Sequence, residues 1–177
     1  HQIGRLLYEF NRLDPQALRD TLVVFTSDHG DMMGDHHHWR KTYAYEGSAR
    51  IPFIVRYPTS WDMPRGQTVE APVELRDIMP TMLDAAGVDI PDSVDGQSLL
   101  PLARGQCDNW RTFVQGEHTS CYTHEHGMQY VTDGKEKYIW FHHTGEEQFF
   151  DLVSDPGECH NLAANSDQQT RIDRWRQ

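Results

Sequence analysis

The chain lacks any long apolar run and any excess of positive charge. No stretch approaches the roughly 20 consecutive apolar residues that a membrane-spanning helix needs, and no segment resembles a signal peptide. Lys and Arg number 16 against 27 Asp and Glu, which gives a formal net charge of -11. Such acidity argues against nucleic acid or an anionic membrane as the main partner. It leaves room for a small anionic substrate that a local cation attracts.

Cysteine is scarce as well. Cys107, Cys121 and Cys159 are odd in number and widely spaced, and none forms a C-x-x-C pair. This usage indicates neither a disulfide framework nor a thiolate metal site. Internal repeats and low-complexity segments are also absent from the sequence.

The 177 residues suffice for one substantial domain, or for one domain with a smaller appendage. The chain starts at His1, and apolar residues follow it at helical spacing, which predicts an amphipathic helix over 2–13. We therefore expect the chain to begin partway through a helix of a longer protein. Asp14 and Pro15 end this helix or start a short second turn.

Two strands and a helix are expected next. The apolar, β-branched run 21–26 is typical of a central parallel strand, and 51–58 predicts a second strand bounded by prolines. A helix is expected over 76–86, with Gly87 as its C-cap. The stripe expected to be buried on this helix comprises Ile78, Met82, Leu83 and Ala86.

The pattern changes near residue 105 to short strands at hairpin spacing. Asp133-Gly134 predicts a tight turn between two of them, and Ser166 predicts the N-cap of a closing helix over 167–176. We therefore divide the chain into 1–105, an α/β portion, and 106–177, a small antiparallel sheet with one helix. The four expected strands are 112–117, 127–132, 137–142 and 148–152.

Residues 27–50 form a long loop rich in Gly, Asp and His, and such loops are usually functional. Asp28 and His29 stand directly after the strand 21–26, and in open α/β sheets the ligand crevice lies beyond the carboxyl ends of strands. Together they offer oxygen and nitrogen ligands for a metal, although an Asp-His-Gly turn can also be a plain capped loop. Lys41, in the same loop, is either a solvated charge or a cation for a sulfuryl or phosphoryl oxygen.

Other polar residues have simpler interpretations. Of His36 to His38, at most one or two can face one site, because three in a row cannot converge. Glu46 and Arg50 stand at i, i+4 spacing, which favours a structural ion pair. The residues expected to organise a turn are Asp155, Glu158 and Asn161, and those expected at the surface are His118, His124 and His126.

Taken as an ordered set, these motifs resemble the C-terminal part of a sulfatase of the alkaline phosphatase superfamily, over nearly the whole chain. The motifs that carry the resemblance are Phe25-Thr26-Ser27-Asp28-His29-Gly30, Gly34-Asp35-His36, Lys41, Tyr45-Glu46 with Arg50-Ile51-Pro52, Asp77-Ile78-Met79-Pro80-Thr81, Asp95-Gly96-Gln97-Ser98-Leu99, and Asp155-Pro156-Gly157-Glu158 with Asn161-Leu162. The implied fold is the C-terminal part of an alkaline-phosphatase-like mixed or parallel sheet domain with helices, followed by a small antiparallel sheet and helix.

The resemblance also implies roles for four residues. Asp28 and His29 correspond to ligands of a divalent metal, with calcium expected first and manganese as the alternative. Lys41 matches a lysine that contacts the sulfate group of a small sulfated substrate. His36 matches a histidine close to the site, and we assign it with Lys41 to catalysis and substrate binding.

The nucleophile of the family is not in this sequence. Sulfatases convert Cys or Ser to formylglycine within a C/S-x-P/A-x-R motif, which none of the three cysteines matches, and the nearest segment, at Ser154, has Glu158 in place of Arg. The paired aspartates that complete the metal shell in the family are missing too. We therefore expect the parent protein to hydrolyse a sulfate ester, and this chain alone to be inactive and to bind metal weakly.

Two alternatives stay open. A phosphonate monoester or phosphodiester hydrolase of the same superfamily shares the metal and lysine geometry. A non-catalytic binding module could retain the loop as a relic, although the joint presence of Asp28, His29 and Lys41 argues against decay.

Overall fold

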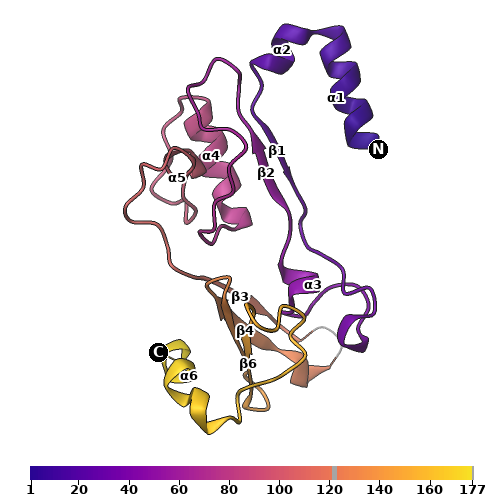
Figure 1. The fold of residues 1–177 in the computed structure, drawn as a ribbon, viewed down its shortest axis with the longest axis vertical. Helices are drawn as coiled ribbons and strands as arrows, with labels where there is room; N and C mark the ends of the chain where they lie inside the picture. The colour runs from indigo at the N-terminus through magenta and orange to yellow at the C-terminus, as the bar shows by residue number, and fades with distance from the viewer. Residues whose placement is uncertain (121–122, 177) are drawn as a thin grey trace. The chain divides into compact units, whose positions relative to one another are not determined.

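The computed structural model describes residues 1–120 and 123–176, so Cys121 lies outside the described residues (Figure 1). The chain forms two compact units. The first unit comprises His1–Ser27, Pro52–Val69 and Arg76–Asp108, and the second comprises Asp28–Ile51, Glu70–Leu75 and Asn109–Gln177. The division into 1–105 and 106–177 stays a prediction, because compactness alone does not show which parts fold independently.

The first unit begins with two helices, of which the first was predicted and the second matches one of the two alternatives for Asp14 and Pro15. Helix α1 spans Gln2–Leu13 and helix α2 spans Pro15–Arg19. Asp14 separates them and caps α2, because its carboxylate accepts a hydrogen bond from the Ala17 amide at 2.8 Å. No residue of α1 is buried, so its apolar face is exposed in this chain.

Strands β1 (Val23–Thr26) and β2 (Phe53–Arg56) form a two-stranded ribbon in the first unit. Both strands are confirmed, and they pair antiparallel, with Val24 opposite Val55, so β2 is not a parallel neighbour of β1. A continuous apolar run indicates burial on two faces and does not specify strand direction.

Helix α4 (Ile78–Ala85), preceded by a 3₁₀ turn at Leu75–Asp77, packs near helix α5 (Leu99–Ala103). The predicted buried stripe was wrong in part, since Met82 is exposed and the fully buried residues of α4 are Pro80 and Thr81. The Thr81 hydroxyl accepts a hydrogen bond from the Leu99 amide at 2.9 Å. This polar contact turns Thr81 toward α5, which apolar spacing alone does not reveal.

The second unit contains a four-stranded antiparallel sheet in the order β3-β4-β5-β6, as the sequence predicts. Its strands are β3 (Val114–His118), β4 (Met128–Thr132), β5 (Glu136–Phe141) and β6 (Glu146–Asp151). The hairpin turn at Asp133-Gly134 is confirmed, with Gly134 at a φ of 85°. Helix α6 (Gln169–Trp175) follows a 3₁₀ turn at Ser166–Gln168, and Asn165 rather than Ser166 caps that turn.

Alternation along the strands gives this sheet two apolar faces. One face packs against the segment Asp28–Ile51, which we call the histidine-rich loop and which also contains a 3₁₀ turn at Asp35–His37 and the short helix α3 (Glu46–Ala49). The other face packs against α6. The core on the loop side comprises Met32, Ala44, Tyr45, Met128, Ile139, Phe141, Phe150 and Leu152, and on the α6 side Tyr138, Phe149 and Ile172.

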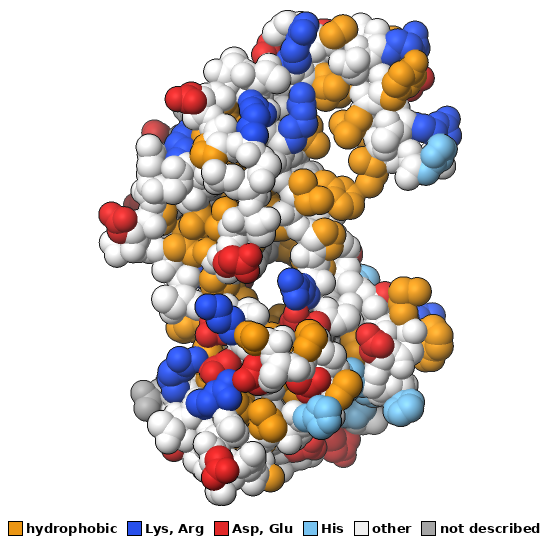
Figure 2. All heavy atoms as spheres, viewed as in Figure 1, with side chains coloured by type: hydrophobic (Ala, Val, Ile, Leu, Met, Phe, Trp, Pro, Cys, Tyr) orange, Lys and Arg blue, Asp and Glu red, His pale blue; other side chains and the backbone are white. Residues whose placement is uncertain are grey.

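Ion pairs join α6 to the strands it covers. The Glu136 carboxylate accepts hydrogen bonds from Arg171 at 2.8 Å and from Arg174 and Trp175 at 2.7 Å each. Figure 2 shows basic and acidic side chains intermingled on the molecular surface. Because these charged side chains are partly exposed, their ion pairs add little to the free energy of folding, and their main effect is to fix the orientation of α6.

No helix in the described part of the chain combines the length and the apolar character that a membrane crossing requires.

The docking of α6 depends on one apolar side chain. Ile172 is fully buried between Tyr138 and Phe149, so Ile172→Ala removes apolar contacts and leaves a cavity. We expect the free energy of unfolding to fall by about 2–5 kcal/mol, measured by urea denaturation. The control is Thr170→Ala on the exposed side of the same helix, with an expected change within about 0.5 kcal/mol. Equal effects of the two substitutions would contradict this packing.

Candidate active site

Three of the four predicted site residues come together within the histidine-rich loop. The Lys41 ammonium lies 2.9 Å from Nε2 of His29, and the Asp28 carboxylate lies 3.4 Å from the same nitrogen. A carboxylate, an imidazole and an ammonium thus share one small region of the second unit. Whether they act as metal ligands and substrate cation stays a prediction.

Hydrogen bonding assigns the tautomer of His29. Its Nδ1 lies 2.7 Å from the backbone carbonyl oxygen of Gly30, and a carbonyl can only accept. Nδ1 therefore carries the hydrogen, and Nε2 presents a lone pair, which accepts from Lys41. Metal-binding histidines commonly have this arrangement, in which one ring nitrogen is held by the backbone and the other is left as a ligand.

The carboxylate of Asp28 is suited to the same role. Desolvation acts to raise its pKa, but His29, the backbone amides of His29 and Asp28, and the charge of Lys41 together lower the pKa below its ordinary value. Asp28 is therefore ionised at neutral pH and offers an oxygen ligand.

The pair fits part of a divalent metal shell. Across residues 1–120 and 123–176, no group of three His, Cys, Asp or Glu side chains is placed to hold a metal ion. A calcium shell needs six to eight oxygens, and an imidazole nitrogen is better matched to a transition metal. Lys41 uses the Nε2 lone pair that a metal would use, so a bound cation and this hydrogen bond exclude each other.

Close backbone packing shapes the loop around these residues. The Gly30 amide donates to the Ser48 carbonyl at 2.8 Å, and the Gly47 carbonyl lies where a Cβ on residue 30 would stand. Only glycine allows this approach, which joins the start of the loop to α3.

Asp31, which sequence reasoning missed, organises the next part of the loop. Its carboxylate accepts hydrogen bonds from the amides of Met33 at 2.9 Å and Arg40 at 3.1 Å. The non-glycine residues with left-handed backbone here are Met33, His36, His37, Arg40 and Thr42. Such conformations persist where surrounding contacts enforce them, and they concentrate at functional sites. An aspartate at the start of an irregular loop is the signal that could have identified this role.

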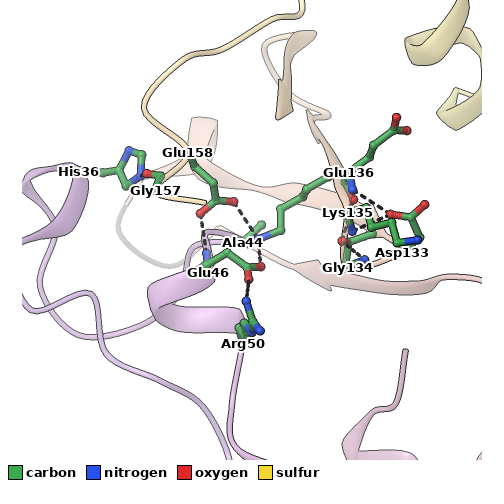
Figure 3. Close-up of polar contacts among 12 residues, drawn as sticks. His36, Ala44, Glu46, Arg50, Asp133, Gly134, Lys135, Glu136, Gly157 and Glu158 are labelled. Atoms are coloured by element: carbon green, nitrogen blue, oxygen red, sulfur yellow. Dashed lines mark hydrogen bonds and ion pairs between the residues drawn. The ribbon is translucent and has the colours of Figure 1, made fainter. Parts of the chain in front are cut away.

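His36, the fourth predicted site residue, is held against the tail of the chain. Its ring stacks on Tyr45 at a centroid distance of 4.1 Å and an interplanar angle of 3°. Its Nε2 donates to the Gly157 carbonyl at 3.1 Å, and Figure 3 shows the two residues side by side. These contacts give His36 a structural role, and its assignment to catalysis and substrate binding stays a prediction.

A buried ion cluster lies beside these residues. Lys137 of β5 is fully buried, and its ammonium donates to Glu46 at 2.7 Å and to Glu158 at 2.8 Å. The predicted Glu46–Arg50 pair is present at 3.4 Å (Figure 3). Sequence reasoning missed Lys137, although a lysine at an inward strand position, two residues before Ile139, requires a charged partner.

Several histidines pack against aromatic rings on the second unit. His38 stacks on Tyr43 at a centroid distance of 3.9 Å, and His126 lies 5.8 Å from the same ring. The rings of His124 and His143 lie 3.6 Å apart. Burial, followed by the neighbouring histidines, lowers the pKa of His38 below its ordinary value. His124 is exposed, as expected, whereas His126 is half-buried.

The lowered pKa of His38 predicts a loss of stability in acid. The fold favours the neutral ring, so this contribution is fully present above the unfolded pKa of about 6.5 and is lost as the pH falls through that value toward the lower folded pKa. We expect an NMR titration of His38 to give a midpoint below 6.5. Tyr43→Ala, which uncovers the ring, should raise that midpoint. A midpoint at or above 6.5 in the unsubstituted protein would refute the burial of His38.

Comparison with known proteins gives consistent results. Residues 34–176 match the family described as N-sulphoglucosamine sulphohydrolase, C-terminal. An arylsulfatase of Clostridium perfringens is 44% identical over 98% of this chain and 35% of its own length. The chain spans about a third of the length of the curated relatives it matches.

Solved structures share the fold. A protein solved in complex with its substrate D-glucosamine-2-N,6-O-disulfate superimposes with a TM-score of 0.87 at 29% identity, covering 98% of this chain and 36% of its own. A phosphonate monoester hydrolase of Silicibacter pomeroyi gives 0.82 at 30% identity, covering 97% and 36%. The α/β fold with small antiparallel sheets is thus that of the alkaline phosphatase superfamily, and the chain belongs to the sulfatase family described as N-sulphoglucosamine sulphohydrolase, C-terminal.

Proposed function

We propose that the protein containing this chain hydrolyses a sulfate ester, and that the chain supplies Asp28, His29 and Lys41 to its active site. The observation that carries the proposal is the Lys41 ammonium 2.9 Å from His29 Nε2, beside the Asp28 carboxylate, in a chain of the sulfatase family. Charge and geometry in this cluster suit an anionic substrate that a metal and a lysine bind together.

Lys41 has the simplest role in this proposal. A sulfate ester carries its negative charge on peripheral oxygens, and that charge shifts as the bond to the leaving oxygen breaks. A fixed ammonium stabilises such charge where water is excluded. Lys41 therefore binds the sulfuryl oxygens and must exchange its contact with His29 for one with the substrate.

Asp28 and His29 would hold a divalent metal, calcium first or manganese, through the carboxylate and the Nε2 lone pair. Such an ion supplies Lewis-acid chemistry at the sulfuryl group. The Gly30 carbonyl keeps the His29 ring in the tautomer that this role requires. Other ligands and the formylglycine nucleophile are assigned to parts of the protein outside these 177 residues, because the sequence contains no C/S-x-P/A-x-R motif.

A second candidate is hydrolysis of a phosphonate monoester or phosphodiester. In sequence identity, the phosphonate monoester hydrolase of Silicibacter pomeroyi is as similar to the chain as the protein solved with the disulfated glucosamine is, with 30% against 29%. A lysine beside a metal can bind a phosphoryl group as readily as a sulfuryl group. If the protein is a sulfatase, sulfated amino sugars are the first substrate class to test, because one structural relative was solved with D-glucosamine-2-N,6-O-disulfate.

Lys41→Ala is expected to lower kcat/KM for an aryl sulfate by about 100- to 1,000-fold, because it removes a charge that stabilises the transition state. The assay is made on the full protein, with an aryl phosphonate monoester as the competing substrate. Lys135→Ala, at an exposed lysine of the hairpin turn, is the matched control and should change the rate less than about twofold.

The outcomes separate the candidates. A higher kcat/KM on the phosphonate would favour the second candidate, and an undiminished rate in Lys41→Ala would reject the site for both. The 177-residue chain alone should turn over neither ester, because two ligands cannot complete a metal shell.

A further inference from the structure

The buried ammonium of Lys137 connects three segments that are distant in sequence. Its three hydrogens are used by the Ala44 carbonyl at 2.7 Å, the Glu46 carboxylate at 2.7 Å and the Glu158 carboxylate at 2.8 Å. Ala44 and Glu46 belong to the histidine-rich loop, and Lys137 belongs to β5. Glu158 belongs to the turn at residues 155–158 that follows β6, which we call the tail turn. A single charge therefore ties the loop to the sheet and to the tail.

Glu158 contacts the loop directly as well. Its second carboxylate oxygen accepts a hydrogen bond from the Glu46 amide at 2.6 Å, which is the first amide of α3 and has no partner within that helix. Glu158 is 3% exposed and has a φ of 54°, a left-handed conformation that the surrounding contacts must maintain.

The tail turn makes a second hydrogen bond to the histidine-rich loop, through Gly157. The Gly157 carbonyl accepts a hydrogen bond from His36 Nε2 at 3.1 Å (Figure 3). The Glu158 amide donates to the Asp155 carbonyl at 3.0 Å, which closes the turn. In the sequence, Lys41 stands between His36 and Glu46, the two loop residues that the turn holds. The stretch that carries Lys41 is thus fixed at both ends by adjacent residues of the tail.

We propose that Glu158 is a positioning residue for Lys41, acting through Glu46 and Lys137. This inference rests on the proposed function, in which Lys41 binds the transferring group. Glu158 does not touch substrate; it sets where the loop places the ammonium. Misplacement by about 1 Å can cost two orders of magnitude in rate.

The test is a double-mutant cycle in the full protein with an aryl sulfate and an aryl phosphonate. Glu158→Gln keeps the size of the side chain and an acceptor for the Glu46 amide, but it removes the charge that faces Lys137. We expect kcat/KM to fall by roughly 10- to 100-fold in the wild-type background, and by less than about 3-fold once Lys41 is alanine. A merely structural residue would lower the rate by the same factor in both backgrounds.

Glu117→Gln, the same change at an exposed position of β3, is the control and should be neutral in both backgrounds. If thermal unfolding shows that Glu158→Gln is not folded, Glu158→Asp, which keeps the charge and shortens the side chain, takes its place in the cycle. Equal factors with and without Lys41, or no effect of either Glu158 variant, would overturn the inference and leave the proposed function intact. No effect of Lys41→Ala itself would overturn both.

Discussion

A single buried ammonium joins the histidine-rich loop and the turn after β6 to the sheet of the second unit. Lys137 has no exposed surface, and its charge is compensated by two carboxylates and one carbonyl, which come from a loop and a turn far from it in the sequence. Desolvating an ammonium is costly unless each of its hydrogens finds a partner. The loop and the tail must therefore take up their observed positions for β5 to bury this residue.

The segment that Lys137 fixes also carries the residues of the candidate active site. These residues are Asp28, His29 and Lys41. The loop backbone is left-handed at several positions, and such conformations persist only where surrounding contacts maintain them. The tail turn supplies Glu158 and the Gly157 carbonyl to the same loop. In this sulfatase family member, the turn that follows β6 thus helps to organise the loop that follows β1.

Much of this arrangement could be predicted from local patterns. Alternation and turn residues located β3 to β6, and the order of the motifs identified the family. The parallel setting of β1 could not be judged, because an apolar run does not encode its partner. The role of Glu158 was missed because turn chemistry explains an acidic residue there equally well, and only the fold brings Lys137 to it.

The charge of Lys137 is expected to hold the histidine-rich loop in place on the sheet. Hydrogen exchange measured on the full protein with Lys137→Met, which keeps the length of the side chain and removes its charge, tests this directly. We predict that amides in Asp28–Ile51, such as those of Gly30 and Met32, exchange about 100-fold faster, while β6 and α6 keep their protection. Unchanged exchange in the loop, or an equal increase across the whole second unit, would contradict the account.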